Sequence, residues 1–181
     1  ASTVTVSPLA SNNAAGDLVS CSLRITDAFG NPSGNGAHIA AFHATVTDSA
    51  GHTVEAAIIH DASSFVLGNY ALQFKSNRSG LTNIAIRYDG LDATSTEVNI
   101  QPKTPNKISN MTCPAKAVSN STVSCSFVST DIFDNVVMSD SFSSSQSLAS
   151  SFFSITPSIH YEISHDGSTF ALRYRLESTD T

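Results

Sequence analysis

The sequence has few positive charges and no long apolar run. Its 181 residues contain nine Lys and Arg against fifteen Asp and Glu, so the formal net charge is −6. A nucleic-acid surface needs clustered cations that neutralise phosphates, and the five arginines here are scattered, so nucleic acid is excluded as a partner. No stretch approaches the roughly 18 consecutive apolar residues of a membrane-spanning helix, and we expect no insertion of this segment into a bilayer.

Strong helix formers are sparse, whereas Ser and Thr supply 31 and 17 of the residues. This composition suits exposed β surfaces and turns, and we expect almost no helix. Several stretches alternate apolar and polar residues, which is typical of strands that bury one face. Their inward residues are Val19, Cys21, Leu23 and Ile25; Phe42, Ala44 and Val46; Val54, Ala56 and Ile58; Tyr70, Leu72 and Phe74; Ile84, Ile86 and Tyr88; and Thr96, Val98 and Ile100. Together they predict an immunoglobulin-like (Ig-like) sandwich of about seven strands.

The pattern then begins again. Residues 20–31 and 124–135 match at seven of twelve positions without a gap, at an offset of 104 residues. One sandwich for roughly each 100 residues is the ordinary size of this architecture. The fold class is therefore all-β, with tandem antiparallel β-sandwiches over residues 1–101 and 107–181. Pro102 and Pro105 make the linker between them, residues 102–106, stiff and extended.

The second copy is less regular than the first. A Ser-rich run over residues 138–151 is typical of a flexible loop. Further strands are expected around Phe153 and Ile155, over residues 160–163 and over residues 170–176. Aligned on the first copy, the second is incomplete, because it stops before its last two strands. We expect the natural chain to continue past Thr181.

Four short motifs of the first copy resemble the filamin-type Ig repeat. They are Asp27-Ala-Phe-Gly-Asn-Pro32, Leu67-Gly-Asn-Tyr70, Ser79-Gly-Leu-Thr-Asn-Ile84 and Tyr88-Asp-Gly-Leu91, in the order that this family has them. The resemblance covers residues 17–101 and, more weakly, residues 107–177. Thr82 stands near a position where the family has a buried Tyr, and Asp134 replaces the counterpart of Gly30. Bacterial invasin-type Ig domains share the first motif and are the alternative.

Three cysteines predict one disulfide. Cys21 and Cys125 are equivalent residues of different copies, so their Cα atoms should lie well beyond the roughly 7 Å limit for a bridge. Cys113 lies on the first strand of the second copy, and a bridge to Cys125 would close a loop of about a dozen residues. Cys21 is then either a buried free thiol or the partner of a cysteine outside this segment.

Three sequons, at Asn77, Asn110 and Asn120, are candidate N-glycosylation sites. Their number is close to what chance gives, but Asn77 and Asn120 fall in predicted turns, where a glycan is tolerated. Together with the predicted disulfide and only four lysines, the sequons favour an oxidising extracellular setting over the cytosol.

No pattern predicts catalysis, a resident metal or a cofactor. The sequence has no Cys-x-x-Cys pair, no zinc-binding His spacing, no Gly-x-Ser-x-Gly elbow and no Gly-rich phosphate loop. Asp27 could gather with Asp48, Asp61 or Asp89 to bind calcium. In the alternative interpretation, which we favour, Asp27 and Asp131 accept backbone N–H bonds within their own turns.

These observations predict a non-catalytic adhesion or structural module of a cell-surface or secreted protein. It would bind protein partners by β-strand addition or by self-association. In filamin-type repeats the third strand with the fourth forms the binding edge, and the resemblance places this edge at residues 40–47 and 53–60. The implied contact residues are Ala41, His43, Thr45, Val54, Ala56 and Ile58.

Three settings fit such a module. The chain resembles the extracellular filamin-type repeats of gamete-surface adhesion proteins of plants and algae. An intracellular actin-crosslinking rod is the first alternative and would have free thiols and no glycans. A spacer module of a surface enzyme or of an extracellular filament is the second.

Overall fold

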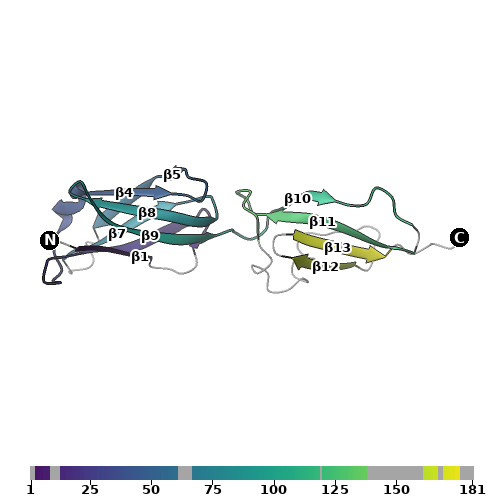
Figure 1. Ribbon diagram of the computed structural model, residues 1–181, viewed down its shortest axis with the longest axis horizontal. Helices are drawn as coiled ribbons and strands as arrows, with labels where there is room; N and C mark the ends of the chain where they lie inside the picture. The colour runs from purple at the N-terminus through teal and green to yellow at the C-terminus, as the bar shows by residue number, and fades with distance from the viewer. Residues whose placement is uncertain are drawn as a thin grey trace. The chain divides into compact units, whose positions relative to one another are not determined.

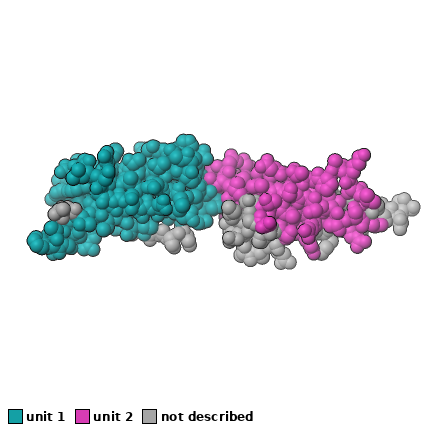
Figure 2. Space-filling view, viewed as in Figure 1, with its two compact units in different colours: residues 1–102 teal, residues 103–181 magenta. Residues whose placement is uncertain are grey.

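The computed structural model describes residues 3–8, 13–60, 67–118, 120–137, 161–166 and 169–175. The chain divides into two compact units, unit 1 (Ala1–Pro102) and unit 2 (Lys103–Thr181), which Figure 2 colours separately. The described residues are strands and turns apart from a single 3₁₀ helix, η1 (Gly36–Ala41). No helix in these ranges is long and apolar enough to cross a membrane. The all-β prediction is confirmed.

Unit 1 is an Ig-like sandwich of two sheets (Figure 1). The first sheet has the order β1 (Thr3–Pro8), β3 (Leu18–Thr26), β7 (Asn69–Lys75), β6 (Ala56–His60). The second has the order β2 (Asn13–Ala14), β9 (Leu91–Gln101), β8 (Gly80–Tyr88), β4 (Phe42–Thr47), β5 (Thr53–Val54). Neighbouring strands are antiparallel, except that β2 runs parallel to β9.

The core of unit 1 lies between the sheets and is built from the alternating residues of the central strands. The inward residues of β3, β7 and β8 are buried: Val19, Cys21, Leu23, Ile25, Tyr70, Leu72, Phe74, Ile84 and Ile86. Burying a large apolar side chain contributes about 1.5–3 kcal/mol, so these strands supply most of the stability. Phe42, Ala44, Ala56 and Ile58 are only half-buried, because β4 and β6 lie towards the edges of their sheets.

Thr82 interrupts this apolar core. It lies on β8, its side chain is 0% exposed, and its hydroxyl has no hydrogen-bond partner among the described residues. A buried hydroxyl without a partner costs about 1–3 kcal/mol. This unsatisfied hydroxyl therefore lowers the stability of unit 1.

Unit 2 repeats the first sheet of unit 1. Its described strands have the order β10 (Lys107–Thr112), β11 (Thr122–Thr130), β13 (Thr169–Arg175), β12 (Tyr161–Asp166). Strand β11 begins and ends 104 residues after β3, and both strands alternate buried and less buried residues. A cluster of Val123, Cys125, Phe127, Phe170 and Leu172 forms the core. The predicted loop over 138–151 and the strand around Phe153 and Ile155 lie outside the described residues.

A glycine marks the entry into β7. Gly68 has a φ of +79°, its N–H donates to the Gly34 carbonyl (3.0 Å), and its own carbonyl accepts from the Ile25 N–H (2.9 Å). A Cβ at this position would lie 2.6 Å from the carbonyl oxygens of Ile25 and Ser33. Only glycine fits so close to the backbone of neighbouring segments.

We predict that Gly68→Ala lowers the free energy of unfolding of unit 1 by about 3 kcal/mol, because it adds a backbone clash to the strain of a positive φ. Gly51→Ala is the matched control, since Gly51 also has a positive φ of +84° but open space around it. The control should cost only about 1 kcal/mol. Chemical denaturation of both variants measures the difference, and equal losses would contradict this account of Gly68.

Candidate interaction surface

Two strands on one side of unit 1 have an outer edge that is unpaired over all or part of its length among the described residues. Strand β6 is the last strand of its sheet and pairs only with β7 among the described residues. Strand β4 pairs with β8 along its whole length, but on its other side only Val46 and Thr47 pair with β5. We call these two open edges the β4–β6 edge. Unpaired backbone N–H and C=O groups at such an edge can accept a further strand.

The predicted strand boundaries at this edge are wrong in two places. Ala40 and Ala41 belong to η1 and not to β4, because Asn35 caps this helix through a bond from the Ala37 N–H to its side-chain oxygen (3.0 Å). The predicted strand over residues 53–60 is two strands, since β5 pairs in one sheet and β6 in the other. Val54 therefore lies in a different sheet from Ala56 and Ile58.

The side chains divide between two faces. His43 and Thr45 are exposed on β4. Ala56 and Ile58 are half-buried and lie opposite the core residues Phe74 and Leu72, so they cannot meet a partner as freely as predicted. The sequence analysis missed the outward residues of β6, Ala57 and Ile59, because it followed only the inward set of the alternation. Ile59 is 42% exposed, which is unusual for a large aliphatic side chain on an open edge.

Tyr70 closes one end of the β4–β6 edge. Its ring lies 5.0 Å from the ring of Phe42 on β4 and 5.4 Å from that of His60 on β6. Its hydroxyl donates to the Asn35 carbonyl (2.8 Å), the residue that caps η1. Burial raises the pKa of this phenol, so it stays a hydrogen-bond donor at neutral pH. The aromatic contacts hold the two edges at a defined separation.

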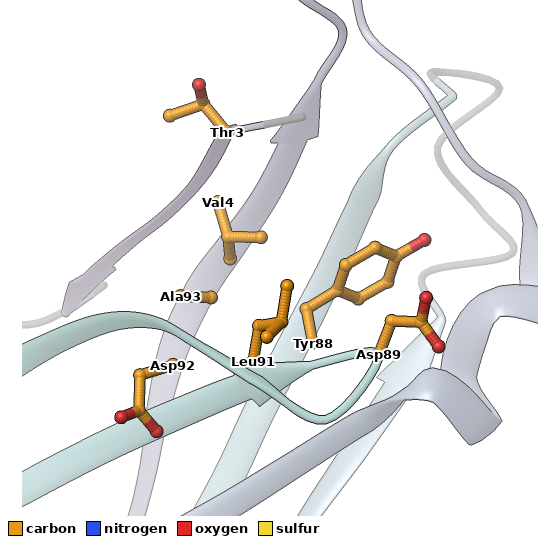
Figure 3. Close-up of a pocket in the computed structure, with 7 residues that line it drawn as sticks. All are labelled: Thr3, Val4, Tyr88, Asp89, Leu91, Asp92 and Ala93. Carbon is orange, nitrogen blue, oxygen red and sulfur yellow. The ribbon is translucent and has the colours of Figure 1, made fainter. Parts of the chain in front are cut away.

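A hollow of about 510 Å³ lies on the other side of unit 1, where β1 and β9 run next to each other (Figure 3). Val4, Tyr88 and Leu91 provide its apolar lining, and Leu91 lies between the carboxylates of Asp89 and Asp92. Arg87 Nε already pairs with Asp92 Oδ1 at 2.8 Å. The lining residues include no nucleophile beside a base, so this hollow offers shape but no reactive pair.

Two of the candidate calcium carboxylates, Asp27 and Asp48, accept hydrogen bonds within their own turns, and so does Asp131. Residues 27–31, 48–52 and 131–135 form the same five-residue turn, in which the first Asp accepts the N–H groups of the third and fifth residues at 2.8–3.0 Å. The fourth residue has a positive φ in each case: Gly30, Gly51 and Asp134. No three metal-ligating side chains come together in the described ranges. Asp61 lies outside these ranges.

These hydrogen bonds change the acidity of the carboxyl groups. The Asn31 side chain and the Asn31 and Phe29 amides lower the pKa of Asp27 below its usual value. Burial pushes the pKa of Asp131 up, but bonds from the Asn135 side chain and from the Lys103 and Phe133 amides outweigh it, so that pKa is also lowered. Each turn is therefore held by an ionised carboxylate at neutral pH.

A disulfide joins Cys113 and Cys125, with Cα atoms 4.3 Å apart. Cys113 lies one residue beyond β10 and is exposed, whereas Cys125 is buried. Cys21 is a buried free cysteine, and the residue opposite it on β1 is Pro8. Burial raises the pKa of the Cys21 thiol, which therefore stays protonated.

The three sequon asparagines are all exposed. Asn77 follows the end of β7. Asn110 lies in a bulge of β10 with a φ of +53°, and Asn120 lies just before β11 with a φ of +62°.

Comparisons with known proteins place the fold. No protein-family model and no curated protein matches the sequence. The structure of FdeC, an Escherichia coli adhesin, covers 97% of this chain at a TM-score of 0.59 and 16% identity. The structure of invasin, a bacterial integrin-binding protein, also covers 97% of this chain, at a TM-score of 0.63 and 16% identity. The match to the filamin domain of Lin-41 covers 55% of this chain and 91% of the Lin-41 chain, at a TM-score of 0.43 and 18% identity.

The first two similarities show an Ig-like fold. The chain spans 55% of the length of the FdeC chain and 34% of that of invasin. Neither protein is a gamete-surface protein, and the comparisons lend no support to that finer resemblance.

The Asp-centred turns predict loss of stability in acid. A carboxylate with a lowered pKa in the folded state stabilises the fold above the unfolded pKa of about 3.9, and this contribution is lost as pH falls through the folded pKa. Calorimetry between about pH 5 and pH 2 should show falling unfolding temperatures for both units. Asp131→Asn should lower the stability of unit 2 at neutral pH but flatten its acid dependence. An unchanged acid dependence in this variant would contradict the role of the carboxylate.

Proposed function

We propose that this chain is a non-catalytic structural or adhesion module that binds an extended segment of a partner protein at the outer edge of β6. The observation that carries the proposal is the edge itself. Five residues, Ala56 to His60, have no neighbouring strand on one side among the described residues. They include no Asp, Glu, Lys, Arg or Pro, the residues by which proteins commonly protect an edge from pairing.

Strand β6 suits a partner better than β4 does. Strand β5 already occupies the Val46 and Thr47 end of β4, so that edge offers fewer free backbone groups. An added strand on β6 would place alternate side chains beside Ala57 and Ile59, which are both exposed. Backbone hydrogen bonds would provide affinity, and the apolar contact with Ile59 would provide selectivity.

An extracellular setting supports this function. The Cys113–Cys125 disulfide is of the kind that persists outside the reducing cytosol. Asn77, Asn110 and Asn120 are accessible to a glycosylating enzyme, and none of them lies on β4 or β6. FdeC is an adhesin and invasin binds integrins, so Ig-like arrays of this fold serve adhesion in other proteins.

The extracellular proposal predicts a specific mass pattern for the chain secreted from eukaryotic cells. Under denaturing conditions without reductant one thiol should react with a labelling reagent, and after reduction three should react. Deglycosylation should lower the intact mass, and replacing each sequon Asn by Gln should remove part of that loss. Three reactive thiols before reduction and no glycan would favour the intracellular rod instead.

The binding proposal predicts that Ile59→Lys weakens peptide binding at β6 without unfolding unit 1. Short random peptides displayed on phage are selected on the immobilised chain, and binding of the selected peptides is then measured by titration. The peptides should shift the NMR amide signals of β6. Ile59→Lys should lower the affinity of the chain for these peptides by about tenfold or more, because a charge at an unpaired edge opposes strand addition.

Leu81→Lys is the matched control for this experiment. Leu81 is an exposed aliphatic residue on β8, which has a neighbour on both sides in the other sheet. Peptide affinity should survive this change. Peptides that shift other strands, or that bind equally well to the Ile59→Lys chain, would overturn the proposed site.

A further inference from the structure

The Asp-centred turn of unit 2 holds the segment that enters its first strand. The Lys103 N–H donates to Asp131 Oδ2 (2.9 Å), and the Asn106 N–H donates to the Thr130 carbonyl (2.8 Å). Pro102 and Pro105 cannot donate such bonds and restrict the backbone to extended conformations between these contacts. A bond to an ionised carboxylate is stronger than one between neutral groups. Thus Asp131 serves both its own turn and the incoming chain.

Unit 1 has the same turn in the same place. Thr3 is opposite Thr26 in the register of β1 with β3, as Lys107 is opposite Thr130 in unit 2, again at an offset of 104 residues. In both turns the carboxylate Oδ2 accepts from the side-chain amide of the fifth residue, Asn31 or Asn135. Asp131 Oδ2 accepts the Lys103 N–H in addition, whereas Asp27 Oδ2 has only the Asn31 bond among the described residues.

The turn at residues 131–135 is less exposed than the turn at residues 27–31. A segment that covers the first turn and not the second would explain this difference. Asp131 is 0% exposed and Phe133 is half-buried. Their counterparts in unit 1 are more open, since Asp27 is half-buried and Phe29 is 90% exposed. Phe29 is thus a large aromatic side chain presented on a turn that five hydrogen bonds of Asp27 hold in place.

We propose that the turn at residues 27–31 is a docking site for an extended polypeptide segment joined to the N-terminal side of β1. The segment would repeat the chemistry of residues 102–106. One of its backbone N–H groups would donate to Asp27 Oδ2, and its side chains would cover Phe29. By the offset of 104 residues, the donor corresponds to the second position ahead of Ala1, just as Lys103 precedes Pro105 by two. The turn is then a coupling point at which a repeat receives the chain entering it.

The experiment adds this segment to the full chain. Gln-Pro-Lys-Thr, a copy of residues 101–104, is fused directly ahead of Ala1. We expect the unfolding temperature of unit 1 to rise by about 4–8 °C, the shift that one added hydrogen bond gives in a domain of this size. Gln-Pro-Pro-Thr is the control, because Pro in place of Lys removes the donor N–H together with the Lys side chain, and it should give a clearly smaller rise.

Asp27→Asn tests the acceptor, because its side-chain N–H₂ replaces Oδ2 and cannot accept. The Gln-Pro-Lys-Thr extension should then raise the unfolding temperature no more than the Gln-Pro-Pro-Thr control does. Amide exchange by NMR on the extended chain with Asp27 intact gives a readout that needs no variant. The added Lys amide should exchange at least roughly tenfold more slowly than an unprotected one. No rise in temperature, an equal rise with Asp27→Asn, or an unprotected Lys amide would overturn the proposal. None of these outcomes depends on whether β6 binds a partner.

Discussion

The pairing of β3 with β7, repeated in unit 2 as β11 with β13, is the interaction on which the rest of the structure depends. Cys21 lies opposite Leu72, and Cys125 lies opposite Leu172. The central strand pair therefore has the same register in both units. Because side chains alternate between faces, that register decides which residues enter the core. It also leaves β6 as the last described strand of the first sheet of unit 1. Strands β1 and β10 lie on the opposite side of the central pair in their units.

The same Asp-centred turn is used at three places for three purposes. It ends β3 and β11 and connects β4 to β5. At Asp48 the carboxylate also lies 3.5 Å from Arg78 Nε and from His52 Nδ1. At Asp131 it holds the incoming chain, and at Asp27 it presents Phe29 to solvent. A rigid local motif can therefore acquire binding roles without any change in the strands behind it.

Much of the fold was predictable from sequence because the alternation on β3, β7 and β8 is strict and the repeat is long. The edge was less predictable, since η1 depends on the Asn35 cap and the separation of β5 from β6 depends on which sheet each joins. Ile59 was missed because a strand at an edge can bury one apolar face and still expose another.

The proposed binding surfaces exist only if each unit folds around its own central pair of strands. Solution NMR tests this most directly, through cross-strand nuclear Overhauser effects between backbone protons. The structure predicts contacts that link Cys21 with Leu72 and, separately, Cys125 with Leu172. Absence of either set, or contacts that join Cys21 to Cys125 in one core, would contradict it.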